Sequence, residues 1–189
     1  MSALYRALLL LLITSSSAWA LEIAGISVPD VVQGDGSQGR MSLAGHAEVH
    51  RRYLPFYGVT LHLPEQRPRS AVLVQGLAPC RITLIWYARD LDAAHVRNYF
   101  AERFAGAADD EVLTRARPRI DQLLEVLPGV SRGSRFSFDY DPDRGMRVEI
   151  DGEPLISLPG VEFNRVLLSL WLGTAAEDGV ARALLAEAS

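Results

Sequence analysis

Two adjacent arginines and a nearby tyrosine are the residues whose chemistry best suits the binding of an anion. Arg51 and Arg52 precede a strongly apolar segment that carries Tyr57. A guanidinium group matches a carboxylate through paired N–H donors, and a phenol adds another donor. These three residues predict a site for a small amphipathic or carboxylate ligand. The alternative is that Tyr57 packs in the core and both arginines are solvated.

The segment around Tyr57 has the pattern of a strand that is buried on both faces. We expect a long strand within residues 43–63, where side chains alternate with period two. One face takes Tyr57, Val59, Leu61 and Leu63, and the other takes Leu54, Phe56, Gly58, Thr60 and His62. Because both faces are substantially apolar, this should be a central strand covered on two sides.

His95 is the candidate for acid–base chemistry, because an imidazole has an unperturbed pKa near neutrality. It lies among apolar residues on an expected helix, an arrangement that is also typical of a structural histidine. The chain contains no lysine, which excludes chemistry through a lysine Schiff base. We expect neither a metal site nor a cofactor.

Two motifs of well-known enzymes occur in the wrong context. Residues 34–39 match the dinucleotide-binding pattern GxGxxG, but residues 40–43 look like a strand instead of the required helix. Residues 129–133 match the nucleophile elbow GxSxG, but a strand-like segment follows the serine and no histidine follows His95. We interpret the first as a hairpin turn, and the second does not indicate a serine hydrolase.

Asp139, Asp141 and Asp143 have the spacing of a calcium-binding loop. In such a loop the sixth position is glycine and the twelfth is glutamate, whereas this chain has Arg144 and Ile150. We interpret the three aspartates as turn-forming residues.

The first twenty residues have the composition of a signal peptide, with Arg6 before an apolar run and Ala18-Trp19-Ala20 at the end. The run is shorter than the roughly 18 apolar residues that a membrane helix needs. We therefore expect cleavage of residues 1–20, a periplasmic or secreted protein, and no membrane span afterwards. Residues 21–189 suit a single domain.

Charge and cysteine content narrow the choice of partners. The formal net charge of −4 becomes −5 without Arg6, and no basic stripe is present, which argues against nucleic acid as a partner. The lone Cys80 cannot form an intrachain disulfide and is expected to be a small core residue. We expect a monomer.

The order of elements predicts an α+β fold, with strands first, helices in the middle, then a meander and terminal helices. Expected strands cover residues 21–28, 31–33, 40–63, 81–89, 135–140, 146–150 and 153–158. Expected helices cover residues 70–77, 91–104, 110–127, 161–172 and 177–186, with a kink at Pro118. On the helix at 161–172, Asn164 and Arg165 should lie away from the apolar stripe.

Four stretches together resemble the bacterial chalcone isomerase-like proteins. They are residues 22–30, residues 43–47 with 56–64, residues 87–91, and residues 160–173. The resemblance implies an open-faced β-sandwich, in which a large antiparallel sheet carries helices on one face and a ligand cleft lies between them.

The isomerases of that family use an arginine whose position falls on Val49 in this chain. Arg51 would point the same way from about 7 Å farther along the strand. The family's strand donor falls on Tyr57. Its helix positions fall near His95 and Glu102, and the polar position of its final helix falls near Ser169. These departures argue against classical chalcone isomerase activity.

The resemblance and the residues together suggest three functions. The first is an exported, non-catalytic protein that binds a small amphipathic or carboxylate ligand, as fatty-acid-binding relatives with this fold do. The second is an isomerase or lyase acting on a conjugated substrate, with His95 as its acid–base group. The third is a structural or partner-binding protein of the cell envelope.

Overall fold

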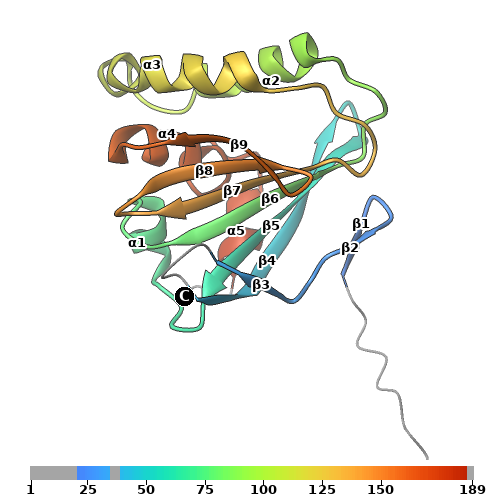
Figure 1. The fold of residues 1–189 in the computed structure, drawn as a ribbon, viewed down its shortest axis with the longest axis horizontal. Helices are drawn as coiled ribbons and strands as arrows, with labels where there is room; N and C mark the ends of the chain where they lie inside the picture. The colour runs from blue at the N-terminus through green and yellow to red at the C-terminus, as the bar shows by residue number, and fades with distance from the viewer. Residues whose placement is uncertain (1–20, 35–38, 187–189) are drawn as a thin grey trace, which may run out of the picture.

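The computed structural model describes residues 21–34 and 39–186. The expected signal peptide at 1–20 and the middle of the glycine-rich turn at 34–39 lie outside this range. Within it, seven strands pair antiparallel in chain order, as one continuous meander (Figure 1). They are β3 (Val31–Gln33), β4 (Arg40–Arg51), β5 (Leu54–Pro64), β6 (Cys80–Trp86), β7 (Arg135–Asp141), β8 (Gly145–Ile150) and β9 (Glu153–Leu158).

The helices pack on one face of this curled sheet, which confirms the predicted open-faced α+β sandwich (Figure 1). They are α1 (Ser70–Val74), α2 (Ala93–Ala105), α3 (Asp110–Val126), α4 (Val161–Leu172) and α5 (Val180–Leu185). The period-two alternation places the large apolar side chains of the central strands on this inner face. Tyr57 pairs with Trp86 across β5 and β6, and Phe138 and Val148 continue the layer on β7 and β8.

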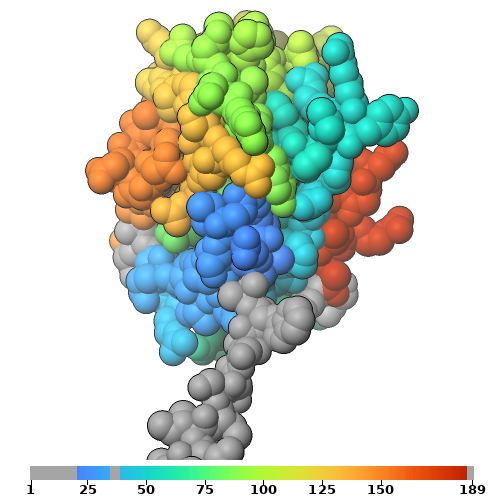
Figure 2. Space-filling model, turned by 90° about the vertical axis from the view of Figure 1, so that its right-hand side faces the viewer, coloured from blue at the N-terminus to red at the C-terminus, as the bar shows by residue number. Residues whose placement is uncertain are grey.

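The outer face of the sheet is covered in part by the N-terminal segment. The expected strand at 21–28 is instead a small hairpin of β1 (Glu22–Ile23) and β2 (Ile26–Ser27), because Ala24 and Gly25 take positive φ angles of 55° and 85°. Figure 2 shows this segment, in blue, seated between β4–β5 in cyan and the meander in gold and orange. Gly58, Thr60 and His62 are buried as a result, which confirms that β5 is covered on both faces.

The expected long strand at 43–63 is a tight hairpin of β4 and β5. Arg52 and Tyr53 form its turn with φ angles of 48° and 68°. Such a turn normally uses Asn-Gly, because other residues are strained in the left-handed region. The turn also leaves Tyr53 99% exposed at the tip of the hairpin.

The two long helices begin at aspartate caps. Asp92 accepts a hydrogen bond from the backbone N–H of His95, and Asp109 accepts one from Val112. The helix α3 continues through Pro118. Within the described ranges, no helix is long and apolar enough to cross a membrane.

The structure tests the predicted environments of four polar or small residues. Asn164 is buried, although it was predicted to lie away from the apolar stripe of its helix. Asp139 lies inside β7 and not in a turn, while Asp141 does form the β7–β8 turn by accepting from the backbone N–H of Asp143. Cys80 is buried, and burial raises the pKa of its thiol to about 12, so it is no nucleophile.

Candidate functional site

A buried pair of tyrosines joins the sheet to the helices. The hydroxyl of Tyr57 on β5 lies 2.9 Å from the hydroxyl of Tyr99 on α2. The indole N–H of Trp171 on α4 donates to the Tyr57 hydroxyl over 3.2 Å. Burial raises the pKa of both phenols, so both stay neutral. Three elements therefore converge on one small polar centre inside an apolar core.

Aromatic rings surround this centre and fill the space between sheet and helices. The ring of Phe56 lies 5.0 Å from Tyr99 and 5.1 Å from Trp86, measured between centroids. The centroids of Tyr57 and Trp86 are 5.3 Å apart. The indole N–H of Trp86 is buried and has no hydrogen-bond partner among the described residues. A buried donor of this kind costs about 1–3 kcal/mol unless an acceptor reaches it.

Arg51 lies at the solvent-facing edge of the aromatic cluster. Its guanidinium carbon is 5.2 Å from the ring centroid of Tyr99 and 5.6 Å from that of Phe56. The same group approaches Glu102 at 3.6 Å, with side chains that are 52% and 70% exposed. The aromatic rings position the cation, whereas the ion pair is loose and solvent-screened.

A second arginine lies deeper beside the same cluster. Arg103 donates to the backbone carbonyl of Leu170 over 2.5 Å and to Glu177 over 3.2 Å. Burial raises the pKa of Glu177, while the charges of Arg103, Arg51 and His50 oppose that shift. Glu177 is thus a partly buried carboxylate placed near both arginines. We call Tyr57, Tyr99, Trp171, Arg51 and Arg103 the tyrosine site.

The structure brings together three of the six candidate residues from the sequence. Arg51, Tyr57 and Glu102 meet at the tyrosine site. Val49, where the resemblance placed the family arginine, is buried and pairs with Tyr57 on the neighbouring strand.

The other three candidates lie elsewhere. Arg52 is exposed in the β4–β5 turn, because the chain reverses there. His95 is 72% exposed, and its Nδ1 lies 2.8 Å from the capping carboxylate of Asp92, which holds the ring at the helix start. The hydroxyl of Ser169 donates to the carbonyl oxygens of Val166 and Ala107, so it serves helix packing.

Sequence reasoning missed the residues that the helices contribute. Tyr99 and Trp171 lie within the apolar stripes of their helices, but the polar atoms of both meet the hydroxyl of Tyr57 in the core. Tyr99 and Arg103 are four residues apart and so share one side of α2, a signal that could have identified the pair. Glu177 was expected to begin the last helix at 177–186, but α5 begins at Val180 and Glu177 lies between α4 and α5. Among the described residues, no group of three or more His, Cys, Asp or Glu could hold a metal ion.

Comparisons with known proteins agree with this architecture. A family model described as chalcone isomerase-like matches residues 20–186. The crystal structure of a fatty-acid binding protein from Arabidopsis thaliana superposes with a TM-score of 0.64 at 16% sequence identity, covering 87% of this chain and 94% of that one. That similarity shows a shared fold. A search of curated proteins gave no match.

Proposed function

The chain belongs to the chalcone isomerase-like family, and we propose that it is a bacterial, exported, non-catalytic protein that binds a small amphipathic carboxylate at the tyrosine site. Export rests on the signal-like composition of residues 1–20. A protein of the same fold binds fatty acids, which supports this choice of ligand.

The position of Arg51 is the observation that carries the proposal. Its guanidinium lies over the rings of Phe56 and Tyr99, and the hydroxyl of Tyr99 meets that of Tyr57 in the core. A carboxylate head group can accept paired hydrogen bonds from such a cation. The unpartnered N–H of Trp86 offers another donor deeper in the cluster. An apolar chain attached to that head group would then contact the aromatic rings.

Access to this site requires aromatic side chains to move, because rings fill the space behind Arg51. Phe56 is only half-buried and contacts Arg51, so it is the ring that can turn outward most readily. Burial raises the pKa of both phenols, so they stay protonated and neither supplies a phenolate base. With His95 exposed on its own helix turn, the tyrosine site favours binding over proton transfer.

The proposal is tested by native mass spectrometry and by displacement of a fluorescent fatty acid from the purified protein, with residues 1–20 removed. We expect dodecanoate to bind one molecule per chain and to compete for the fluorescent probe. Methyl dodecanoate has the same chain without the charge and should bind more weakly. Equal binding of acid and ester, or no displacement by either, would contradict the proposal.

Lowering the pH should strengthen the binding of a permanently anionic ligand through Glu177. The pKa of Glu177 is raised, so its ionised form is present at neutral pH and is lost as the pH falls through the raised value. Its protonation removes a negative charge that competes for Arg51 and Arg103. For dodecyl sulfonate, which keeps its charge, we expect about three- to tenfold tighter binding on going from neutral to mildly acidic pH, equivalent to about 1 kcal/mol.

Two variants separate the contribution of Glu177 to this pH dependence from that of His50. His50 lies near Glu177, and protonating it would also favour an anion. In His50→Gln the pH dependence should persist, whereas in Glu177→Gln it should be largely abolished and binding at neutral pH should be tighter. A pH response that disappears only in His50→Gln would contradict the role of Glu177.

A further inference from the structure

The outer face of the sheet carries two rows of polar side chains that run across four strands. The strand register aligns Thr60, Thr83, Ser137 and Glu149 in one row, and His62, Arg81, Asp139 and Arg147 in the next. Because side chains alternate along a strand, these rows point away from the tyrosine site, which lies on the helix-covered face. Polar residues in such number are unusual on a face that is partly buried.

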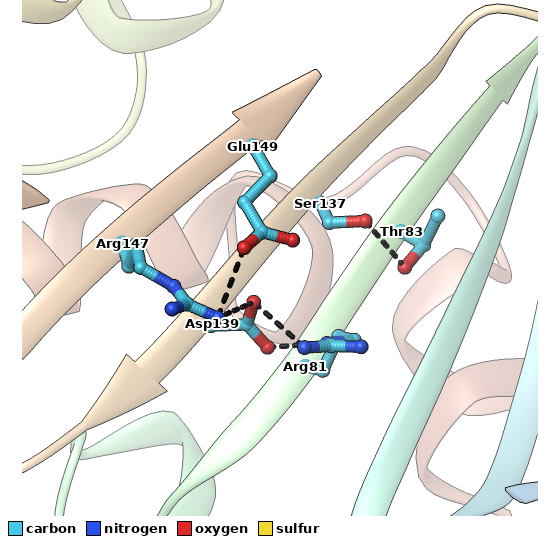
Figure 3. Close-up of polar contacts among 6 residues, drawn as sticks. All are labelled: Arg81, Thr83, Ser137, Asp139, Arg147 and Glu149. Atoms are coloured by element: carbon cyan, nitrogen blue, oxygen red, sulfur yellow. Dashed lines mark hydrogen bonds and ion pairs between the residues drawn. The ribbon is translucent and has the colours of Figure 1, made fainter. Parts of the chain in front are cut away.

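Charges in these rows compensate one another. Figure 3 shows Arg81 and Arg147 converging on Asp139, with Glu149 also paired to Arg147. Arg81 makes a bidentate contact with Asp139, and Arg147 lies 3.7 Å from Asp139 and 3.0 Å from Glu149. Two positive and two negative groups leave no net charge. These four side chains therefore mostly satisfy one another.

A cavity of about 170 Å³ lies between these rows and the N-terminal segment. Thr60, His62, Thr83 and Ser137 line it from the sheet, and Val28 and Pro29 line it from the segment above. The volume corresponds to about five or six water molecules. The cavity is polar on the sheet side and can hold a small hydroxylated molecule.

Two buried polar atoms among its lining residues have no partner in the described part of the chain. They are the hydroxyl oxygen of Thr60 and Nδ1 of His62, in residues that are 0% and 1% exposed. Nε2 of His62 lies 2.9 Å from the carbonyl oxygen of Pro29, so Nε2 carries the proton and Nδ1 is an acceptor. Desolvation by burial lowers the pKa of this imidazole and keeps it neutral. Nδ1 therefore needs a donor from outside the chain.

We infer that this cavity is a second binding site, for a small neutral polyol. Hydroxyl groups can donate to Nδ1 of His62 and can both donate to and accept from Thr60, Thr83 and Ser137. A carboxylate cannot donate to Nδ1 of His62. The charged residues that line the cavity are Arg81, Arg135 and Glu149, so acetate is included in the test to separate an anion from a neutral ligand. Satisfying the two orphaned atoms removes part of the cost of leaving them buried and unpaired. This site is independent of the proposed fatty-acid function.

The test follows the ring nitrogens of His62 by NMR in protein labelled with ¹⁵N-histidine, titrated with glycerol, erythritol, glucose or acetate. This readout is used because polyols stabilise proteins non-specifically through exclusion from the surface. We expect a saturable shift of the Nδ1 resonance with at least one polyol and none with acetate. A shift with acetate alone would overturn the ligand class, and no saturable shift would mean that the cavity holds water only.

Thr60→Val removes the hydroxyl with little change of shape. We expect it to lower the affinity for the polyol at least about tenfold, because one hydrogen bond to an otherwise unpaired partner is lost. Thr83→Val tests the same row if the first variant does not fold. Binding of dodecanoate should be unchanged in either variant, because the tyrosine site is on the other face. An unaltered polyol affinity in a folded Thr60→Val protein would overturn the assignment.

Discussion

Replacing Asp139 with asparagine is expected to destabilise the protein by about 3–5 kcal/mol, the cost of breaking a buried ion pair by removing one partner. Asp139 is 1% exposed and faces two guanidinium groups, those of Arg81 and Arg147. An amide carries no charge to compensate them. Arg81 would then remain largely buried beside an uncharged group (Figure 3).

Urea unfolding followed by circular dichroism measures this change, with Asp143→Asn as the matched control. Asp143 is exposed in the adjacent turn, so its substitution should alter the free energy of unfolding by no more than about 0.5 kcal/mol. Replacing both members of the pair, as in Arg81→Met with Asp139→Leu, should cost much less than Asp139→Asn. A loss below about 1 kcal/mol for Asp139→Asn would show that the pair is solvated.

This ion pair also illustrates what the sequence could not predict. Arg81 and Asp139 fall within the expected strands at 81–89 and 135–140. However, two helices separate β6 from β7 along the chain, and no local signal sets the register of the two strands. The pairing of Arg81 with Asp139 follows only from that register. The same holds for the second binding site, whose row of Thr60, Thr83 and Ser137 comes from three strands.

Local patterns did predict the elements where periodicity or turn chemistry was clear. The meander from β7 to β9 follows from alternating side chains and from the Asp151-Gly152 turn. The start of α2 follows from an aspartate cap at Asp90 or Asp92, of which the structure uses Asp92. The β4–β5 turn was missed because Arg52 and Tyr53 are not turn-forming residues. Strained backbone at such a position is common beside functional sites.

The strand side of the tyrosine site was predicted and the helix side was not. Arg51 and Tyr57 could be identified because a cation lies close in sequence to a phenol at the start of an apolar segment. On α2, matching the family positions pointed to His95 and Glu102, whereas the buried hydroxyl belongs to Tyr99, one helical turn from His95. An aromatic residue in an apolar stripe carries no sign of whether its hydroxyl meets a partner, so only the three-dimensional arrangement identifies it.

Replacing Arg51 with methionine is expected to weaken dodecanoate binding by about ten- to hundredfold, the value of a hydrogen bond to a charged group. Methionine keeps an apolar stem against Phe56 and Tyr99 but removes the cation. Binding of methyl dodecanoate should hardly change, since the ester offers no charge. Isothermal titration calorimetry with both ligands separates the loss of charge from a loss of packing.

Arg52→Met is the matched control, because Arg52 is the next residue, has the same charge and is exposed in the turn. If the two arginines act only through the general field of the hairpin tip, both variants should lose affinity equally, and the loss should fade as salt is added. If Arg51 instead contacts the carboxylate directly at the tyrosine site, only Arg51→Met should lose affinity. Equal losses would therefore move the ligand from the tyrosine site to the exposed tip, even if fatty-acid binding itself were confirmed.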